Sequence, residues 1–435
     1  MQRPYSKYRF RFLILLWIAM LPQAFLLAQS DTLRYTRQEA EKIFLDNNLP
    51  LLAERLNISQ ADARILQAKA WNNPVFNLGD VQLYNTPNTD ESPPLFGNFW
   101  RNRTFTASIE QLVQTAGKRR KSVALEMRNK EQAEQTFTDM LLSLKAEFRQ
   151  LCAELYFLQE VSADRSYQLQ EVTQLVRAQQ SLLQEGNISQ VEFFRLKGLL
   201  LSLQVEIKGF RERLSEVQKS LKTLMNASPA AFLVLTDPVL VNPQSIQALK
   251  QHNPETLTAL AEAHNASLAA TRKGTEVSEA ALKLEKANAV PNVTFNLGYD
   301  RNGNNQLNFL GAGVGMELPV FNRNKGNIKV ARLEVQKSML MEKNKVNEVH
   351  NSVVQTWTDL NRSIALFEEI DTGYIGRLHQ MTVAVTRNFK EKNISLLQLL
   401  DFLQSFRESK EQYYEALKDI ATQKEELNYL TGQEL

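Results

Sequence analysis

Hydrophobic positions along this chain follow two different periods. Residues 118–185 contain neither glycine nor proline, and large apolar residues recur there in alternating steps of three and four. The first series is Phe137, Leu141, Leu144, Phe148, Leu151, Leu155 and Leu158. A second series is Leu203, Ile207, Phe210, Leu214, Val217, Leu221 and Leu224. This spacing is typical of the seam of a coiled coil. It predicts helices over 118–185 and 188–227, the first reaching about 100 Å.

The second half of the chain continues the helical period less regularly. Its apolar positions are Val346, Val349, Val353, Leu360, Ile364 and Phe367, followed by Leu396, Leu399, Leu403 and Phe406. No proline occurs after Pro319. We therefore expect helices over 327–391 and 394–431.

Four other segments alternate with a period of two, as half-buried strands do. They lie near 74–84, 103–113, 291–301 and 307–320. In "VTFNLGYD", for example, Val293, Phe295, Leu297 and Tyr299 share one face. Alternating runs of about ten residues have the length that a membrane-spanning β-strand requires.

The order of these elements is written twice. "GNIS" at 186–189 and "KNIS" at 392–395 each precede an apolar helix, 206 residues apart, and "EQLVQTAGKRR" resembles "ELPVFNRNKGN" at a similar offset. The duplication predicts two structural repeats, 32–228 and 251–432, joined by a linker over 229–250.

The N-terminus has a different character. Four basic residues and no acidic residue lie in 1–28, around a short apolar stretch that ends before a small residue, Ala28. This is the pattern of a secretory signal peptide over 1–28. Its removal would change the net charge from +3 to −1, so the basic composition gives no reason to expect nucleic acid as a partner.

The alternating strands constrain the assembly. Four strands cannot close a barrel, and an open sheet edge has no hydrogen-bond partners in lipid. Three copies would supply twelve strands. The charged helices cannot cross a membrane, so they must stand in the periplasm. We expect a mixed α+β membrane protein: a trimeric twelve-stranded outer-membrane β-barrel, four strands per chain, on a long α-helical coiled-coil tunnel.

The chain resembles the TolC-like outer-membrane factors, in particular the branch paired with heavy-metal or small-molecule efflux pumps. The features that carry the resemblance are the repeat, the strand pairs, the "GKRR" and "NKGN" helix starts and the "GNIS" and "KNIS" turns. The resemblance covers about residues 32–432. It implies a homotrimer in outer-membrane lipid with a periplasmic helical extension. It also implies a periplasmic adaptor (membrane fusion) protein and an inner-membrane efflux pump as partners, and passive conduction of the exported substrate.

The resemblance also assigns roles to the two turns and to one carboxylate. The adaptor-docking tips would be Gly186, Asn187, Ile188 and Ser189 (the first tip) and Lys392, Asn393, Ile394 and Ser395 (the second tip). The periplasmic aperture would be lined by Gln398 and Asp401, so that three copies form a ring of three carboxylates. From the residues alone, each tip is equally well a plain helix-stop turn, whereas a solvated surface residue is the favoured interpretation of Asp401.

No motif for catalysis, a cofactor or a metal site occurs, and "GAGVG" at 311–315 lacks the spacing of a nucleotide loop. The alternative function is a secreted or surface coiled-coil scaffold or adhesin stalk. That alternative accounts for the heptads but not for the four alternating strands.

Overall fold

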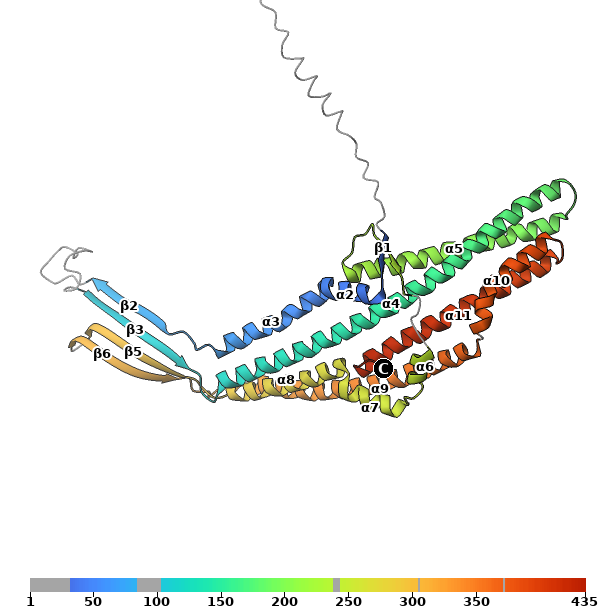
Figure 1. Cartoon of the computed structure of the whole chain (residues 1–435). Coiled ribbons are helices and arrows are strands. Elements are labelled where there is room, and N and C mark those ends of the chain that lie inside the picture. The colour runs from blue at the N-terminus through green and yellow to red at the C-terminus, as the bar shows by residue number, and fades with distance from the viewer. Residues whose placement is uncertain (1–31, 84–102, 238–242, 304–305, 371) are drawn as a thin grey trace, which may run out of the picture.

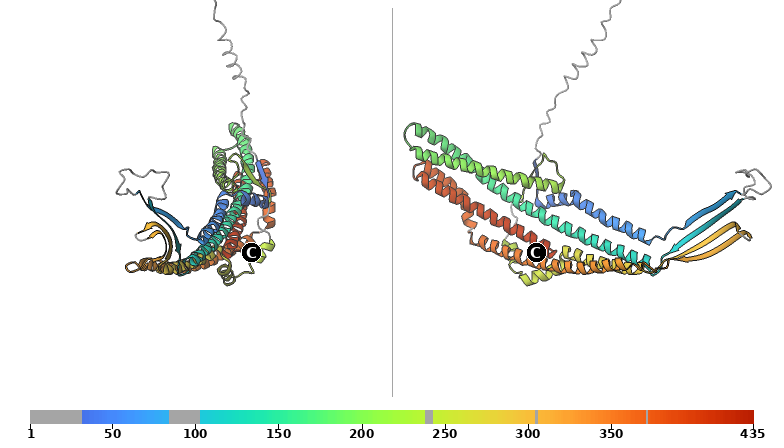
Figure 2. Two further views of the ribbon diagram at one scale, coloured as in Figure 1. Left: turned by 90° about the vertical axis from the view of Figure 1, so that its left-hand side faces the viewer. Right: turned by 180° about the vertical axis from the view of Figure 1, so that it is seen from behind.

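The computed structural model describes residues 32–83, 103–237, 243–303, 306–370 and 372–435. The expected signal peptide 1–28 and the polar segment 85–102 between the first two strands lie outside these residues. The molecule is a long curved slab with a sheet at one end and two helical hairpins at the other (Figure 1). Figure 2 shows that sheet and helices bend together around one concave side.

A four-stranded antiparallel sheet forms the first end of the slab. Its strand order is β2-β3-β5-β6. The strands are β2 (Val75–Leu83), β3 (Arg103–Val113), β5 (Val293–Gly303) and β6 (Gln306–Met316). The β3–β5 pairing joins the two sequence repeats into one sheet. Strand β6, expected to run to residue 320, ends at Met316, shortly before Pro319, which has no N–H to donate.

Next to the sheet lies a layer of four helices in the packing order α3–α4–α8–α9. Their bounds are α3 (Leu49–Lys69), α4 (Lys118–Gln184), α8 (Ala266–Asn288) and α9 (Lys325–Glu369). Helix α4 continues past this layer to the far end, because its sequence contains no helix-breaking residue.

The far half of the slab consists of two hairpins in the order α5–α4–α11–α10. The additional helices are α5 (Gln190–Met225), α10 (Thr372–Lys390) and α11 (Leu396–Thr431). The single helix expected over 327–391 is in fact two helices, α9 and α10. Helix α9 ends at Glu369, and its C-cap residue, Ile370, has an extended backbone. Thr372 and Gly373, which favour helices weakly, follow shortly after.

Small elements surround the middle of the slab. They are β1 (Thr32–Tyr35), α2 (Arg37–Asn47), β4 (Phe232–Leu235), α6 (Pro243–Leu249) and α7 (Pro254–His264). Strands β1 and β4 pair in parallel, so the segment expected as a linker contributes a strand and a short helix. Two of the three hydrophobic clusters lie at this level and the third between the hairpins. Among the residues whose burial is described, none of β2, β3, β5 or β6 belongs to these three clusters.

Candidate functional site

The first tip connects α4 to α5 through a helix stop and a helix start in direct succession. Gly186 has φ +74°, the left-handed conformation that glycine adopts without strain. Its N–H donates to the Leu183 carbonyl (3.1 Å), and the Asn187 N–H donates to the Leu182 carbonyl (2.8 Å), a Schellman motif. Ser189 then caps α5, because its Oγ accepts from the Glu192 N–H while the Glu192 carboxylate accepts from the Ser189 N–H.

The second tip repeats this geometry between α10 and α11. The Lys392 N–H donates to the Phe389 carbonyl (3.0 Å) and the Asn393 N–H to the Asn388 carbonyl (2.8 Å). Ser395 caps α11 through the Gln398 N–H. Two substitutions distinguish the tips: Lys392, with φ +61°, stands where the first tip has Gly186, and Gln398 stands where it has Glu192.

The side chain of Gln398 completes the capping box at the start of α11. Its side-chain oxygen accepts from the Ser395 N–H (2.9 Å) and from the Ser395 hydroxyl (3.1 Å). Asp401 lies one turn further along α11 and is exposed, with the exposed Leu397 four residues before it and the exposed Phe402 directly after it. Of the two residues assigned to an aperture, one therefore completes a helix cap and one is an exposed surface carboxylate.

The two tips lie next to each other, although 206 residues separate them (Figure 1). Ile188 and Ile394 pack against one cluster, whose most deeply buried members are Leu196 and Leu399. A depression of 290 Å³ between the tips is lined by residues of both. The remaining residues of the tips are exposed, namely Gly186, Asn187, Ser189, Lys392, Asn393 and Ser395. The hairpin ends thus form one surface of polar groups on an apolar base.

Away from the tips, a buried arginine joins three helices. Arg165 of α4 is 1% exposed, and its guanidinium contacts carboxylates of Asp164, Glu206 of α5 and Glu411 of α11 at 3.3, 3.5 and 2.5 Å. Burial lowers the pKa of Arg165, and the neighbouring Glu411 and Asp164 oppose that effect. The sequence does contain a signal for this residue, since Arg165 falls seven residues after Leu158, at a position of the apolar seam.

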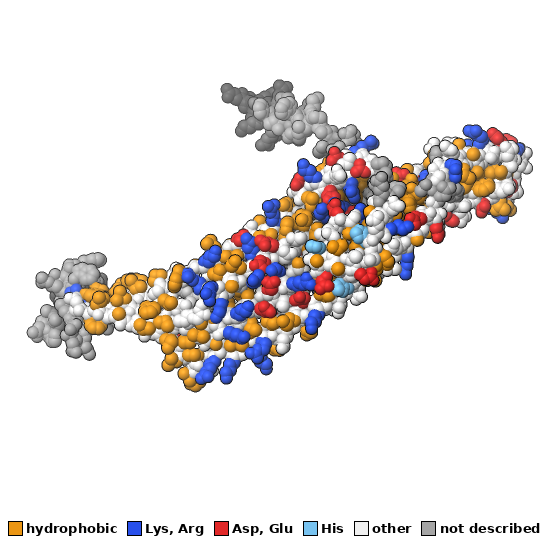
Figure 3. Space-filling model, turned by 60° about the horizontal axis from the view of Figure 1, so that its bottom comes forward, with side chains coloured by type: hydrophobic (Ala, Val, Ile, Leu, Met, Phe, Trp, Pro, Cys, Tyr) orange, Lys and Arg blue, Asp and Glu red, His pale blue; other side chains and the backbone are white. Residues whose placement is uncertain are grey.

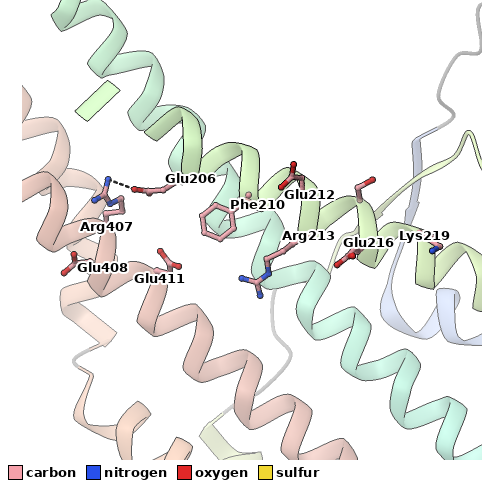
Figure 4. A pocket seen from close by; sticks show the side chains of 11 residues that line it. Glu206, Phe210, Glu212, Arg213, Glu216, Lys219, Arg407, Glu408 and Glu411 are labelled. Carbon is pink, nitrogen blue, oxygen red and sulfur yellow. Dashed lines mark ion pairs between the residues drawn. The ribbon is translucent and has the colours of Figure 1, made fainter. Parts of the chain in front are cut away.

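Beside this arginine a groove of 1020 Å³ separates α5 from α11. Figure 4 shows Arg407 of α11 reaching across it to Glu206 of α5, an ion pair of 3.3 Å. Its lining alternates acidic and basic side chains around Phe210. Within the described parts of the chain, no group of three or more His, Cys, Asp or Glu side chains could hold a metal ion. Ion pairs across the groove, such as Arg407–Glu206, join the two hairpins.

Two buried asparagines hold the ends of the hairpins in place, and no local sequence pattern singles them out. Asn48 caps α3 through the Leu51 N–H and donates from its amide to the Leu224 carbonyl of α5 (both 2.9 Å). Asn265 does the same at α8, accepting from the Leu268 N–H (2.8 Å) and donating to the Leu430 carbonyl of α11 (2.9 Å). Each amide thus joins the start of one helix to the end of another.

The sheet has one apolar face that nothing in the described part of the chain covers. The strand register aligns the predicted apolar positions of all four strands, so that Phe76, Ile109, Leu297 and Ala312 form one cross-strand row. The larger residues on this face are 48–70% exposed: Phe76, Leu78, Ile109, Phe295, Leu297, Leu310, Val314 and Met316. The opposite face carries mainly Thr, Ser, Asn and Gly, including Gly311, Gly313 and Gly315, together with Glu110, Asp300 and the apolar Leu112 and Phe309.

The helices differ from the sheet in this respect. No helix in the described segments is long and apolar enough to cross a membrane.

The sequence of this chain matches a family model and a known protein. Residues 42–227 match the family model of the outer membrane efflux proteins. The cobalt-zinc-cadmium resistance protein CzcC of Cupriavidus metallidurans is 22% identical over 396 residues, covering 88% of this chain and 90% of that protein.

Solved structures share the fold at lower identity. CusC, described as a transmembrane channel, superposes with a TM-score of 0.68 at 15% identity, covering 93% of this chain and 94% of CusC. The open-state MtrE outer membrane channel of Neisseria gonorrhoeae has a TM-score of 0.68 at 13% identity, covering 91% of this chain and 89% of MtrE. The CmeC outer membrane channel of Campylobacter jejuni also has 0.68 at 13% identity, covering 91% and 85%.

Proposed function

Because this chain belongs to the outer membrane efflux protein family, the TolC-like channels, we propose that it forms the outer-membrane exit duct of a tripartite efflux system. Three copies conduct passively what an inner-membrane pump delivers through a periplasmic adaptor. The family is one of efflux channels, and we assign this chain no catalytic role and no cofactor.

The exposed apolar face of the sheet carries this proposal. Side chains such as Leu310 and Val314, each 70% exposed, would leave an extended hydrophobic patch in water. In a bilayer the same face contacts lipid, while the Gly-, Thr- and Asn-rich face lines a polar interior. The strands hold this alternation over about ten residues, the length needed to cross an outer membrane.

The packing order supports closure by further copies. At each level the slab has two edges: β2 and β6 in the sheet, α3 and α9 next to it, and α5 and α10 in the hairpins. The outer face of α3 presents Leu49, Leu52 and Leu56, and that of α9 presents Val330, Leu333 and Leu340, all 42–67% exposed. Both sets recur in steps of three and four or seven, as a helix–helix seam requires. Edge-to-edge contact between copies would bury them and pair β2 with β6.

The coiled-coil scaffold remains the second candidate only for the helical part. A stalk uses heptads such as those of α4 and α5, but it has no use for a sheet whose apolar face is uncovered.

The tips are proposed as the adaptor-docking surface, and Asp401, with Gln398 beside it, as the aperture. The paired tips offer exposed polar groups on a rigid base in which both turns are hydrogen-bonded. Asn187 and Asn393 are suitable positions for a test, because both side chains are exposed and occupy equivalent places in the two tips. Asn187→Lys together with Asn393→Lys should leave membrane insertion intact and abolish crosslinking to the adaptor. Unchanged crosslinking would place docking elsewhere.

The similarity to CzcC is the basis for a proposal about the exported cargo. CzcC is a cobalt-zinc-cadmium resistance protein, and we propose divalent metal cations as the exported class. Deleting the gene should then lower cellular tolerance to zinc, cobalt or cadmium, and the intact gene should restore it.

The decisive experiment is fractionation combined with mass measurement. The full chain should be found in the outer-membrane fraction, should show heat-modified gel mobility, and should have three times the mass of the mature chain in mild detergent. A scaffold would be recovered in the soluble fraction. A stable monomer with protected strand amides would also contradict the duct.

A further inference from the structure

Basic side chains gather where the helices meet the sheet. Residues 118–125 contain Lys118, Arg119, Arg120 and Lys121 and no Asp or Glu, and residues 320–333 contain Arg323, Lys325, Lys329 and Arg332 and no Asp or Glu. Figure 3 shows Lys and Arg side chains crowded over the helices nearest the strands, with acidic side chains joining them farther from the sheet. We call the exposed members Arg120, Arg323, Lys325, Lys329 and Arg332 the basic collar.

The position of the collar is unfavourable for the helices themselves. Arg120 lies in the first turn of α4, and Lys325 begins α9. The N-terminus of a helix carries partial positive charge, so cations there destabilise it and acidic residues would be favoured. Neither helix has an acidic residue in its first turn.

The collar is also not neutralised within the chain. Among the described residues, none of the ion pairs within 4.0 Å involves Arg120, Arg323, Lys325, Lys329 or Arg332. The nearby Glu285 carboxylate instead accepts from the Asn324 amide at 2.7 Å. Lys325, Lys329 and Arg332 are spaced by four and three residues, so they lie on one side of α9.

A neighbouring copy would not neutralise it either. In the edge-to-edge arrangement proposed above, α9 of one copy meets α3 of the next, antiparallel to it. The sheet end of α3 carries Arg64 and Lys69, which add further positive charge, and its one carboxylate there, Asp62, is paired with Lys130 of the same chain at 2.8 Å. A counter-anion for the collar must therefore come from outside the protein.

Side chains suited to a membrane interface stand directly beside the collar. Phe321 is fully exposed, and Leu318 and Val320 are 71% and 61% exposed. Trp71, 63% exposed, lies under the Arg119 guanidinium at 4.1 Å. Exposed aromatic residues next to Lys and Arg are typical of the level at which lipid headgroups meet hydrocarbon.

We propose that the collar binds the phosphate groups of anionic phospholipids in the periplasmic leaflet of the outer membrane. Phosphatidylglycerol has the required chemistry, a net negative phosphodiester above acyl chains that the apolar face of the sheet can contact. Binding would fix the height of the sheet in the membrane and compensate the cations at the two helix starts. This inference rests on the proposed membrane insertion of the sheet.

The test uses the purified full chain in mild nonionic detergent, with bound lipids counted by native mass spectrometry. Phosphatidylglycerol is compared with phosphatidylcholine of the same acyl chains. Each Lys or Arg near an anionic lipid surface strengthens binding about fivefold. The wild-type chain should prefer phosphatidylglycerol at least about tenfold, and high salt should reduce that preference.

The key variant is Lys325→Gln/Lys329→Gln/Arg332→Gln, which should lose most of the preference. Its matched control, Lys42→Gln/Arg195→Gln/Arg211→Gln, removes three exposed cations far from the sheet and should keep it. The charge-conserving variant Lys325→Arg/Lys329→Arg/Arg332→Lys should also keep it, which separates charge from folding. Millimolar glycerol phosphate should not displace the lipid, because the acyl chains contribute to binding.

Equal binding of the two lipids by the wild-type chain would overturn the collar, as would an unchanged preference in the triple Gln variant. Displacement of the lipid by glycerol phosphate would also overturn it, since it would indicate a site for a soluble anion. If the chain forms trimers in the outer membrane but shows no preference for phosphatidylglycerol, the proposed lipid binding by the collar is wrong and the proposed duct stands. If it does not insert at all, the proposed duct fails first.

Discussion

At the scale of single residues, a few buried polar groups determine how the ends of the helices are placed against each other. Asn48 and Asn265 are 1% and 3% exposed, yet each amide makes two hydrogen bonds to backbone groups of different helices. A buried polar group stabilises only when it is paired in this way. The equivalence of the two asparagines shows that the duplicated sequence repeats interactions as well as element order.

Replacing either asparagine by alanine should destabilise the protein by about 2 kcal/mol, because a helix cap is lost and a buried carbonyl is left unpaired. The shift in the denaturant midpoint of helix unfolding measures this. Asn57→Ala is the control, since Asn57 is exposed and bonds only Glu54 among the hydrogen bonds described, and it should change stability by less than about 0.5 kcal/mol. If Asn57→Ala and Asn48→Ala lowered the free energy of unfolding by similar amounts, the stabilising role of the buried asparagines would be contradicted.

The single cysteine, Cys152, should be unreactive in the folded protein. It is fully buried, and burial raises the pKa of its thiol from about 9 to about 12. The reactive thiolate is therefore absent at about pH 8, and a disulfide reagent should label Cys152 only after denaturation. Because the folded state retains the proton that the unfolded state loses, this group stabilises the fold below about pH 9 and progressively less up to about pH 12. Rapid labelling of the native protein would show that α4 opens locally.

At the scale of elements, each tip is a rigid turn with a Schellman stop on one side and a capping box on the other. The same four-residue pattern tolerates glycine or lysine at its left-handed position. At Gly186 an added Cβ would meet no atom within 4 Å, so backbone strain alone distinguishes the two residues.

Gly186→Ala should therefore cost about 1 kcal/mol, and Lys392→Gly should stabilise the second tip by about 0.5 kcal/mol. Lys392→Ala is the matched control, because it removes the charge and leaves φ positive. Thermal unfolding of the three variants would measure the differences. A stabilising Gly186→Ala would mean that the first tip has another conformation in the assembled protein.

At the scale of the whole molecule, one chain is an open curved slab, which we propose to be one segment of a closed trimer. Among the described residues, many exposed apolar side chains lie on the sheet face and on the lateral edges. In the proposed duct, lipid covers the face and other copies cover the edges.

Leu333→Asp/Leu340→Asp should prevent the proposed assembly of copies, because two carboxylates would be buried at each seam without partners. The control, Gln38→Asp/Asn47→Asp, places two aspartates at exposed sites of α2, which forms neither lateral edge of the slab. The mass in mild detergent should fall to that of one chain for the first variant only. Trimers formed by both variants would place the contact on a different edge.

Asp401→Asn should weaken cation preference in single-channel recordings, since the proposed ring of three carboxylates would become neutral without a change of shape. Asp46→Asn removes the same charge from an exposed site on α2 and should leave conduction unchanged. If Asp401→Asn conducts like the wild type, other residues set the aperture.

The sequence by itself determined the local structure. Heptads specified α4, α5 and α11, of which α4 and α11 contain neither glycine nor proline. Alternation specified four strands and the face that most of their apolar residues take, and Ser189 and Ser395 specified two helix starts. These are short-range effects, since backbone sterics, hydrogen bonds between near neighbours and the spacing of apolar side chains act within a few residues.

Only the tertiary structure decided how these elements combine. It divided the expected helix 327–391 at Ile370, joined β3 to β5 and placed the two tips side by side. It also paired Arg165 with carboxylates of α5 and α11 and set Asn48 against the end of α5. The physical reason is that such contacts join residues far apart in the sequence. Their free energy depends on burial and on partners that no local pattern contains.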